Sequence, residues 1–337
     1  MRAFRSLAIV VLCALIVADL AILVACRQHP DNASAAPKKF EPNSTRLERG
    51  RYLTEGPMHC FVCHSEADKN LMPLPGKKGA GKTMFPKGEF PFTVRAPNIT
   101  PDPETGAGRW TDEEIVRALR DGIGHDGRVL FPLMPYEYFR RLTDEDLASV
   151  VVYIRSLPPV RNEIPKPYIP DEARKRLVAI EPMKGSAPEL DWKDPVKRGE
   201  YYATLATCAG CHTPGDLGGP PIPGMRFGGG VTFGVWGVTS ANITPSPSGI
   251  SYYDKKMFVE VIRTGHVKAR ELKPIMLWRS FRNMNDEDLK AIYAYLRTVA
   301  PVQHRVDNTE PPTPCKLCKG KHGAGDRNDA FAAKVGK

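Results

Sequence analysis

The sequence predicts an all-α protein built from two tandem copies of one module. Residues near 46–160 and near 195–303 carry the same signals in the same order, and strand-like alternation of polar and apolar residues is nearly absent. The chain has 337 residues with 42% hydrophobic content, which is enough for two domains that each bury a core. We therefore expect two tandem helical domains.

The repeat is defined by short motifs at matching positions. Because all of them keep their order, a chance similarity is excluded and each copy is expected to fold as one domain. In first and second copy respectively, the motifs are Arg-Gly-X-Tyr at 49–52 and 198–201, Asn-Ile-Thr-Pro at 98–101 and 242–245, a methionine at 134 and 276, Asp-Glu-Asp-Leu at 144–147 and 286–289, and Pro-Val at 159–160 and 301–302.

Helix signals lie between these motifs. Thr111 is followed by three acidic residues and then by an amphipathic run that stops at Gly122. Thr143 opens a second run, through Ile154, in the same way. Both starts have the pattern of a capping box. The Gly- and Pro-rich stretch 73–91 is expected to form a long loop instead of a sheet.

Each copy contains one Cys-X-X-Cys-His string, the signature of c-type haem attachment. Two cysteines at this spacing reach the two vinyl groups of one porphyrin, and the adjacent histidine lies under the iron. Disulfides and zinc knuckles also use paired cysteines, but neither predicts the histidine twice. We expect two covalently attached haem c groups, bound through Cys60, Cys63, His64 and Cys208, Cys211, His212.

A sixth iron ligand is expected from Met134 and Met276, because a methionine recurs at the same place in both copies. Thioether sulfur favours the ferrous state and raises the reduction potential. Core filling is the ordinary role of methionine and is the competing interpretation. His125 and His266 could also be ligands, but they do not occupy equivalent positions, so we expect both on the surface or in loops.

With these strings, the Asn-Ile-Thr-Pro segments and the methionine segments, about two thirds of the chain resembles the cytochrome c subunits of membrane-bound alcohol and gluconate dehydrogenases. The resemblance implies two tandem cytochrome c-like domains, each wrapped around one covalent haem. It implies an electron carrier, not a catalyst, that passes single electrons from a periplasmic dehydrogenase toward quinone or a terminal oxidase. The alternative is a dihaem peroxidase-like oxidoreductase, which needs one iron with an open sixth position.

A third cysteine pair departs from the family pattern. Those subunits usually have three haem modules, but here Cys315 and Cys318 are followed by Lys319 in place of histidine, with under thirty residues left. A local disulfide is the favoured interpretation for an oxidising compartment. A haem ligated by Lys319 and a metal held by Cys315, Cys318 and His322 are the alternatives.

The N-terminus has the layout of an export segment. Arg2 and Arg5 precede an apolar run from Leu7 to Ala25, and Cys26 follows in a lipobox-like context. A lipoprotein attached through Cys26, an uncleaved membrane helix and plain secretion are all compatible with this layout. We expect the protein on the periplasmic side of the bacterial inner membrane, attached through a lipid or helix at its N-terminus.

The formal charge of +10 favours docking on acidic protein surfaces or anionic lipid. Lys and Arg are spread along the whole chain, so we do not expect nucleic-acid binding. The expected segments are a signal peptide or anchor at 1–25, a flexible tether at 26–44, domain 1 at 45–162, a linker at 163–192, domain 2 at 193–304 and a tail at 305–337.

Overall fold

The computed structural model describes residues 39–85, 92–166, 169–175, 177, 180–215 and 220–328. The chain from Phe40 onward forms one compact unit. The expected export segment, Cys26 and most of the tether lie outside the described residues. Within the described part of the chain, no helix is both long enough and apolar enough to cross a membrane.

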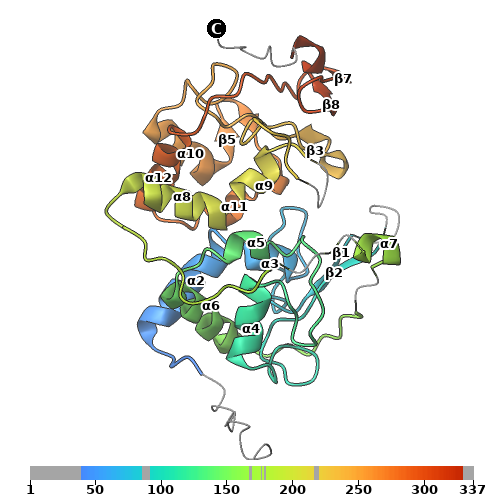
Figure 1. Ribbon diagram of the computed structural model, residues 1–337, viewed down its shortest axis with the longest axis vertical. Helices are drawn as coiled ribbons and strands as arrows, with labels where there is room; N and C mark the ends of the chain where they lie inside the picture. The colour runs from blue at the N-terminus through green and yellow to red at the C-terminus, as the bar shows by residue number, and fades with distance from the viewer. Residues whose placement is uncertain are drawn as a thin grey trace, which may run out of the picture. The chain divides into compact units, whose positions relative to one another are not determined.

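Helices dominate both repeats (Figure 1), and the same order of helices recurs in each. The first repeat contains α2 (Ser44–Glu55), α3 (Cys60–Cys63), β1 (Lys82–Phe85), β2 (Val94–Ala96), α4 (Asp112–Arg120), α5 (Tyr136–Phe139) and α6 (Asp144–Ser156). The second contains α8 (Pro195–Leu205), α9 (Cys208–His212), β3 (Thr232–Phe233), η1 (Gly234–Trp236), β4 (Val238–Thr239), α10 (Lys255–Thr264), β5 (His266–Val267), β6 (Arg270–Glu271), η2 (Pro274–Met276), α11 (Trp278–Phe281) and α12 (Asp286–Leu296).

The fold is not strictly all-α. Four two-stranded antiparallel sheets are present among the described residues: β1–β2, β3–β4, β5–β6 and, in the tail, β7 (Pro312–Pro314) with β8 (Lys321–Gly323). These strands have two to four residues, which is too short to produce a readable alternation of polar and apolar side chains. Strand β1 lies inside the stretch 73–91 that was predicted to be a loop.

One of the two predicted capping boxes is present. At the start of α4, the Thr111 side chain accepts from the Glu114 amide and the Glu114 carboxylate accepts from the Thr111 amide. At α6, Thr143 caps the amide of Asp146, but the Asp146 carboxylate instead pairs with Arg49, with 2.6 and 2.7 Å between the bonded atoms. The motif is therefore only half a capping box, because its acidic residue is used for tertiary contacts.

Helix α2 packs against α6, and α8 packs against α12 in the same way. Each pair touches at a glycine. A Cβ added to Gly50 would lie 2.0 Å from the Ser149 carbonyl oxygen, and one added to Gly199 would lie 1.9 Å from that of Ala291. The Arg-Gly-X-Tyr motif therefore places glycine where two helix backbones meet.

A tyrosine of each repeat donates a hydrogen bond to an aspartate of the other repeat. Tyr201 of the second repeat donates to Asp146 at 2.5 Å, and Tyr52 of the first repeat donates to Asp288. Each aspartate also binds an arginine of its own repeat, and Arg198 lies 2.5 Å from Asp288. The arrangement is reciprocal, so the motif residues join the repeats as well as the helices within each repeat, and one apolar cluster spans both.

The described residues of the connection between the repeats are mostly exposed and include a helical turn, α7 (Asp171–Arg174). Ile169 is buried against Phe92 and Val94, so the linker packs on the first repeat. The backbone amide of Phe40, in the predicted tether, donates a hydrogen bond to Asp112 at 2.8 Å, so this residue also packs on the first repeat.

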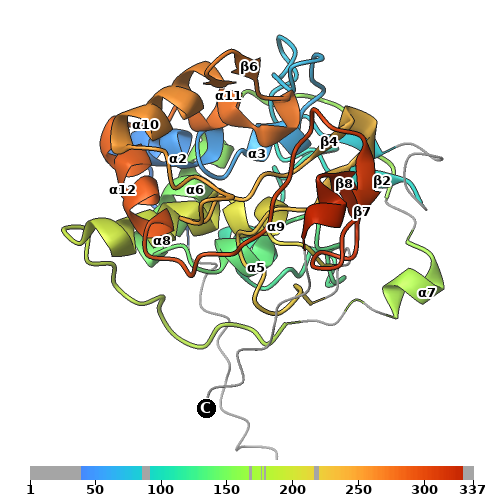
Figure 2. The ribbon, with the colours of Figure 1, turned by 90° about the horizontal axis from the view of Figure 1, so that it is seen from above.

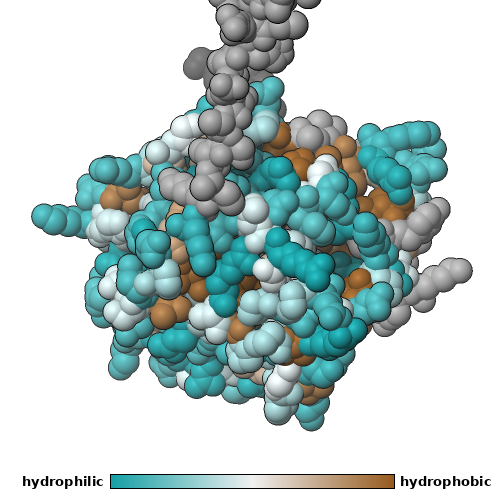
Figure 3. Space-filling view, turned by 90° about the horizontal axis from the view of Figure 1, so that it is seen from below, coloured by the Kyte–Doolittle hydropathy of each residue, from teal (hydrophilic) through white to brown (hydrophobic). Residues whose placement is uncertain are grey.

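Figure 2 shows the helices from a second direction, and the face in Figure 3 is largely hydrophilic with apolar side chains in small groups.

Replacing Gly199 with alanine tests the helix contact. The new methyl group must displace the α12 backbone, and overpacking of this kind lowers the free energy of unfolding by roughly 1–3 kcal/mol. Denaturant unfolding of the haem-loaded protein, followed by circular dichroism, measures the change. Gly234→Ala is the control, because nothing lies within 4 Å of a Cβ at that position. Equal stability of the two variants would contradict the close contact.

Candidate functional site

Each Cys-X-X-Cys-His string forms a single helical turn that the chain enters sharply. The preceding residues, His59 and Thr207, have φ of 41° and 52°, in the left-handed region. No disulfide links the four cysteines of the strings. Burial raises the pKa of Cys60 and of Cys208 to about 12.

The two expected proximal histidines are oriented by backbone carbonyls. Nδ1 of His64 lies 2.8 Å from the Pro97 oxygen, and Nδ1 of His212 lies 2.7 Å from the Ala241 oxygen. A carbonyl only accepts, so Nδ1 carries the proton and Nε2 keeps its lone pair for a metal. Burial lowers the pKa of both rings, which favours the neutral form that a metal needs.

The Asn-Ile-Thr motif fixes the loop that carries these carbonyls. The Asn242 amide donates to the Val302 and His304 carbonyls at 2.7 and 3.1 Å. Its oxygen accepts from the amide and hydroxyl of Thr244, whose hydroxyl in turn accepts from the Val302 amide. Asn98 makes the equivalent bonds in the first repeat. The motif therefore ties the histidine's carbonyl partner to the segment that follows the closing helix.

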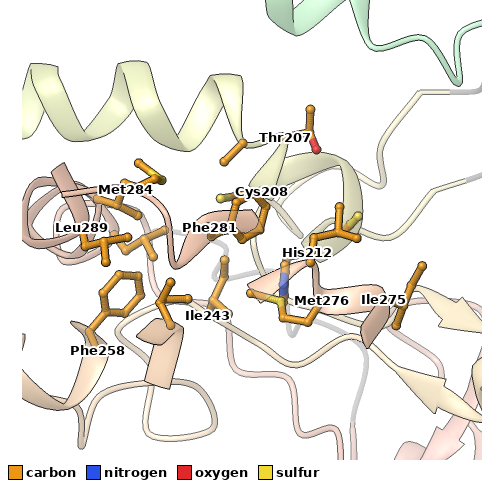
Figure 4. A pocket seen from close by; sticks show the side chains of 16 residues that line it. Thr207, Cys208, His212, Ile243, Phe258, Ile275, Met276, Phe281, Met284 and Leu289 are labelled. Atoms are coloured by element: carbon orange, nitrogen blue, oxygen red, sulfur yellow. The ribbon is translucent and has the colours of Figure 1, made fainter. Parts of the chain in front are cut away.

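A pocket lies beside α9 in the second repeat. It brings together four predicted site residues: Cys208, Cys211, His212 and Met276. Figure 4 shows His212 and Met276 beside one another, from α9 and η2. The rest of the lining is almost entirely apolar: Ala206, Thr207, Ile243, Phe258, Ile262, Ile275, Leu277, Phe281, Met284, Leu289, Ile292 and Leu296.

The segment after each candidate methionine is fixed by an aromatic ring packed on a glycine. Gly122 and Gly265 have φ of 65° and 72°. A Cβ on Gly122 would lie 2.7 Å from the Tyr136 ring, and a Cβ on Gly265 would lie 2.2 Å from the Trp278 ring. Gly122 follows α4, and Gly265 follows α10. Each glycine leaves room for the aromatic ring two positions after the candidate methionine, which is Tyr136 in the first repeat and Trp278 in the second.

The rival histidines lie at the surface. His125 and His266 are both exposed, as expected. The His125 ring stacks on Trp110 with 4.4 Å between ring centroids.

The two strings lie close to one another. The His59 ring, next to Cys60, packs edge-on against Phe281 of the second pocket, with 5.8 Å between centroids. Cys63 and Cys211 are near enough to raise the pKa of the Cys211 thiol, after the larger effect of burial. The cysteine-bearing edges of the two candidate sites therefore face each other.

The third cysteine pair does not form the predicted disulfide. Cys315 and Cys318 are buried and unbonded, and Lys319 is exposed. His322 lies beside them together with His304, a residue that the sequence analysis did not select. In the sequence, His304 stands out only when the two repeats are aligned, because it occupies the position of Asn162 in the first copy.

Comparison with known proteins identifies the family. The cytochrome c family model matches residues 47–158 and 196–300, so the chain belongs to the cytochrome c family. That family carries covalent haem c and transfers electrons.

Curated relatives are redox proteins. The chain is 31% identical over 285 residues to the fructose dehydrogenase cytochrome subunit of Gluconobacter japonicus, covering 80% of this chain and 56% of the relative. It is 28% identical over 299 residues to the cytochrome c subunit of the quinone-dependent alcohol dehydrogenase of Gluconobacter oxydans, covering 82% and 60%. A dihaem cytochrome c-type protein of Cereibacter sphaeroides is 27% identical, covering 72% and 83%. The chain thus spans only a little over half the length of the two dehydrogenase relatives.

His59 should make stability depend on pH. Burial lowers its pKa to about 4 from an ordinary value near 6.5, so between these values only the unfolded chain binds the proton. Stability is full above pH 6.5 and falls toward pH 4, with a cost of roughly 2–3 kcal/mol at pH 4.5. His59→Thr, which copies Thr207, should remove this loss. Denaturant unfolding at pH 7 and 4.5 measures it.

The control for that experiment is His125→Thr, because the His125 ring is exposed. It should keep the full wild-type loss of stability at pH 4.5. An identical pH dependence in wild type and His59→Thr would show that His59 titrates normally in the folded protein.

Proposed function

We propose that this chain is a dihaem cytochrome c that relays single electrons and is not itself a catalyst. The observation that carries the proposal is the pocket in which Cys208, Cys211, His212 and Met276 meet within an apolar lining. A c-type haem requires two thiols that bond covalently to its vinyl groups, and an imidazole Nε2 and a thioether that can serve as iron ligands. Bound there, the haem supplies one reversible Fe(III)/Fe(II) couple.

We assign the first haem to Cys60, Cys63, His64 and Met134, within residues 45–162. The second haem lies within residues 193–304. Support for the first set comes from its equivalence to the second. His64 bonds to the Pro97 carbonyl, which is the counterpart of the Ala241 carbonyl beside His212, and Met134 packs against the core as Met276 does. The chain's own residues orient the ring nitrogen, close the sixth position and exclude water.

The proximity of the two strings supports transfer within the chain. His59 and Phe281 are in contact between them, and a Cβ on Gly210, between the second pair of cysteines, would lie 3.1 Å from the Tyr138 hydroxyl. Haem edges held at these cysteines would be separated by side chains in van der Waals contact. An electron that enters one haem can then leave from the other.

We propose a dehydrogenase as donor, because the relatives include cytochrome subunits of fructose and alcohol dehydrogenases. Quinone or a terminal oxidase is the proposed acceptor. The proposed location is the periplasmic side of the inner membrane, with attachment through Cys26 or an N-terminal helix. The net charge of +10 favours acidic docking partners and anionic lipid.

A dihaem peroxidase-like enzyme is the competing function, and ligation separates the two. Met276→Ala should open the second iron, so carbon monoxide binds the reduced protein at about one site per chain and the reduction potential falls. Met284→Leu is the control. Met284 lines the same pocket and is fully buried, but its counterpart in the first repeat is Leu142. Rapid binding of carbon monoxide by the wild type would overturn the pure relay.

The haem count is tested by intact mass of the protein isolated from membranes of a host that matures cytochromes c. We expect two haems per chain, and one in a Cys208→Ser/Cys211→Ser variant. The same spectrum reports whether the chain begins at a lipid-bearing Cys26. Three haems in the wild type would indicate that Cys315 and Cys318 also bind one.

A further inference from the structure

We infer that His304, Cys315, Cys318 and His322 bind one zinc ion that fastens the C-terminal tail to the second repeat. The ligand atoms of these four residues all lie within 4.8 Å of one another. All four residues are buried. Two thiols and two imidazoles in a tetrahedral group are a donor set that selects zinc.

The separations match tetrahedral coordination. Nε2 of His304 lies 3.2 Å from Nε2 of His322, and Sγ of Cys315 lies 3.4 Å from Nε2 of His304. Zinc bonds of 2.0–2.1 Å to nitrogen and 2.3 Å to sulfur place nitrogens about 3.3 Å apart, and nitrogen about 3.6 Å from sulfur, at the corners of a tetrahedron. The Nε2 atoms of His304 and His322 and the Sγ of Cys315 are therefore near tetrahedral separations, and Cys318 completes a group whose ligand atoms all lie within 4.8 Å of one another.

The hydrogen bonds of the two histidines point to a cation between them. Nδ1 of His304 lies 2.7 Å from the Gly228 oxygen, and Nδ1 of His322 lies 2.9 Å from the Gly323 oxygen. Carbonyl oxygens only accept, so both Nδ1 atoms are protonated and both Nε2 atoms present lone pairs to each other. A carbonyl bound to the other ring nitrogen is typical of metal-bound histidine. The two thiols at the same point favour a metal ion over a shared proton.

The tail is built to present the thiols together. Strands β7 and β8 form a hairpin whose turn carries both cysteines. The Cys315 amide donates to the Gly320 oxygen at 2.8 Å, and Lys319 takes a φ of 62° to close the turn. This Cys-X-X-Cys turn followed by a ligand on the next strand is a zinc-knuckle arrangement.

The site joins the tail to the loop behind the second haem histidine. Cys318 lies directly on Gly230, where a Cβ would come within 2.9 Å of both the Cys318 Cβ and the His304 ring. The amide of the neighbouring Gly229 donates to the carbonyl of His212. Asn308 of the tail also exchanges two hydrogen bonds with Thr239, on strand β4.

The first repeat shows what His304 adds. At the equivalent position, Asn162 donates its side-chain amide to the Ala80 oxygen at 2.8 Å. Ala80 and Gly228 correspond, because the next residue in each repeat donates to the carbonyl of the string histidine. Asparagine thus suffices for the loop contact. His304 keeps the contact with the loop carbonyl through Nδ1. Its second nitrogen, Nε2, plays no part in that contact and is explained by metal binding.

A small apolar cluster would hold the tail weakly without a metal. It contains Met225, Val302, Cys315, Leu317 and Cys318. Bound zinc compensates for a small core in many short segments. It also keeps the two thiols from oxidising to a disulfide outside the cytoplasm.

The test is metal analysis of the full-length, haem-loaded protein by plasma mass spectrometry. We expect about one zinc per chain, in addition to the haem iron. His304→Asn copies Asn162 and keeps the loop hydrogen bond, and it should lower zinc by roughly tenfold or more while iron stays unchanged. His266→Asn, at an exposed histidine, is the control and should retain zinc.

A second readout follows the thiols. In the native protein, Cys315 and Cys318 should resist iodoacetamide, and removal of zinc with dipicolinate should make both react. Absence of zinc in the wild type, unchanged zinc in His304→Asn, or copper in its place would overturn the assignment. So would a tail peptide that carries a disulfide. None of these results depends on the number of haems, because iron and zinc are measured separately.

Discussion

In each repeat, the hydrogen bond from the string histidine to a backbone carbonyl is the interaction on which the site depends. The carbonyl of Ala241 determines which nitrogen of His212 is free for a metal. That carbonyl is in turn placed by Asn242, whose amide binds the chain just after the closing helix. A buried imidazole, a loop and a helix terminus are thereby held in one network, and a displacement of any of them would turn the ring away from its target.

The interface between the repeats follows from duplication. Because both copies carry an Arg-Gly-X-Tyr motif and an acidic closing helix, each can donate a tyrosine to the aspartate of the other. Tyr201 reaches Asp146, and Tyr52 reaches Asp288. These carboxylates are buried, and each is paired with arginine, so neither is left as an uncompensated charge. The reciprocal contact places the two cysteine strings side by side without any element dedicated to that purpose.

The features that could be predicted from the sequence are those encoded by residues at short, fixed spacings along the chain. The Cys-X-X-Cys-His strings and the helix starting at Thr111 are local patterns, and the structure forms α9 and α4 from them. The short hairpins were missed because two to four residues carry no period. The half-formed capping box at Thr143 was mistaken for a complete one because nothing local reveals that Asp146 pairs with Arg49, 97 residues away in the chain.

His304 was missed for a similar reason. A lone histidine in a loop has no periodic or spacing signal, and its partners lie 11 to 18 residues further along. The informative comparison is with the other copy. Both copies need a hydrogen bond to the loop carbonyl, and in the first copy the short side chain of Asn162 is enough to make it. The larger side chain of His304 makes the same bond through Nδ1, so the contacts of its other ring nitrogen need a separate explanation. Those contacts are with Nε2 of His322 and the sulfur of Cys315.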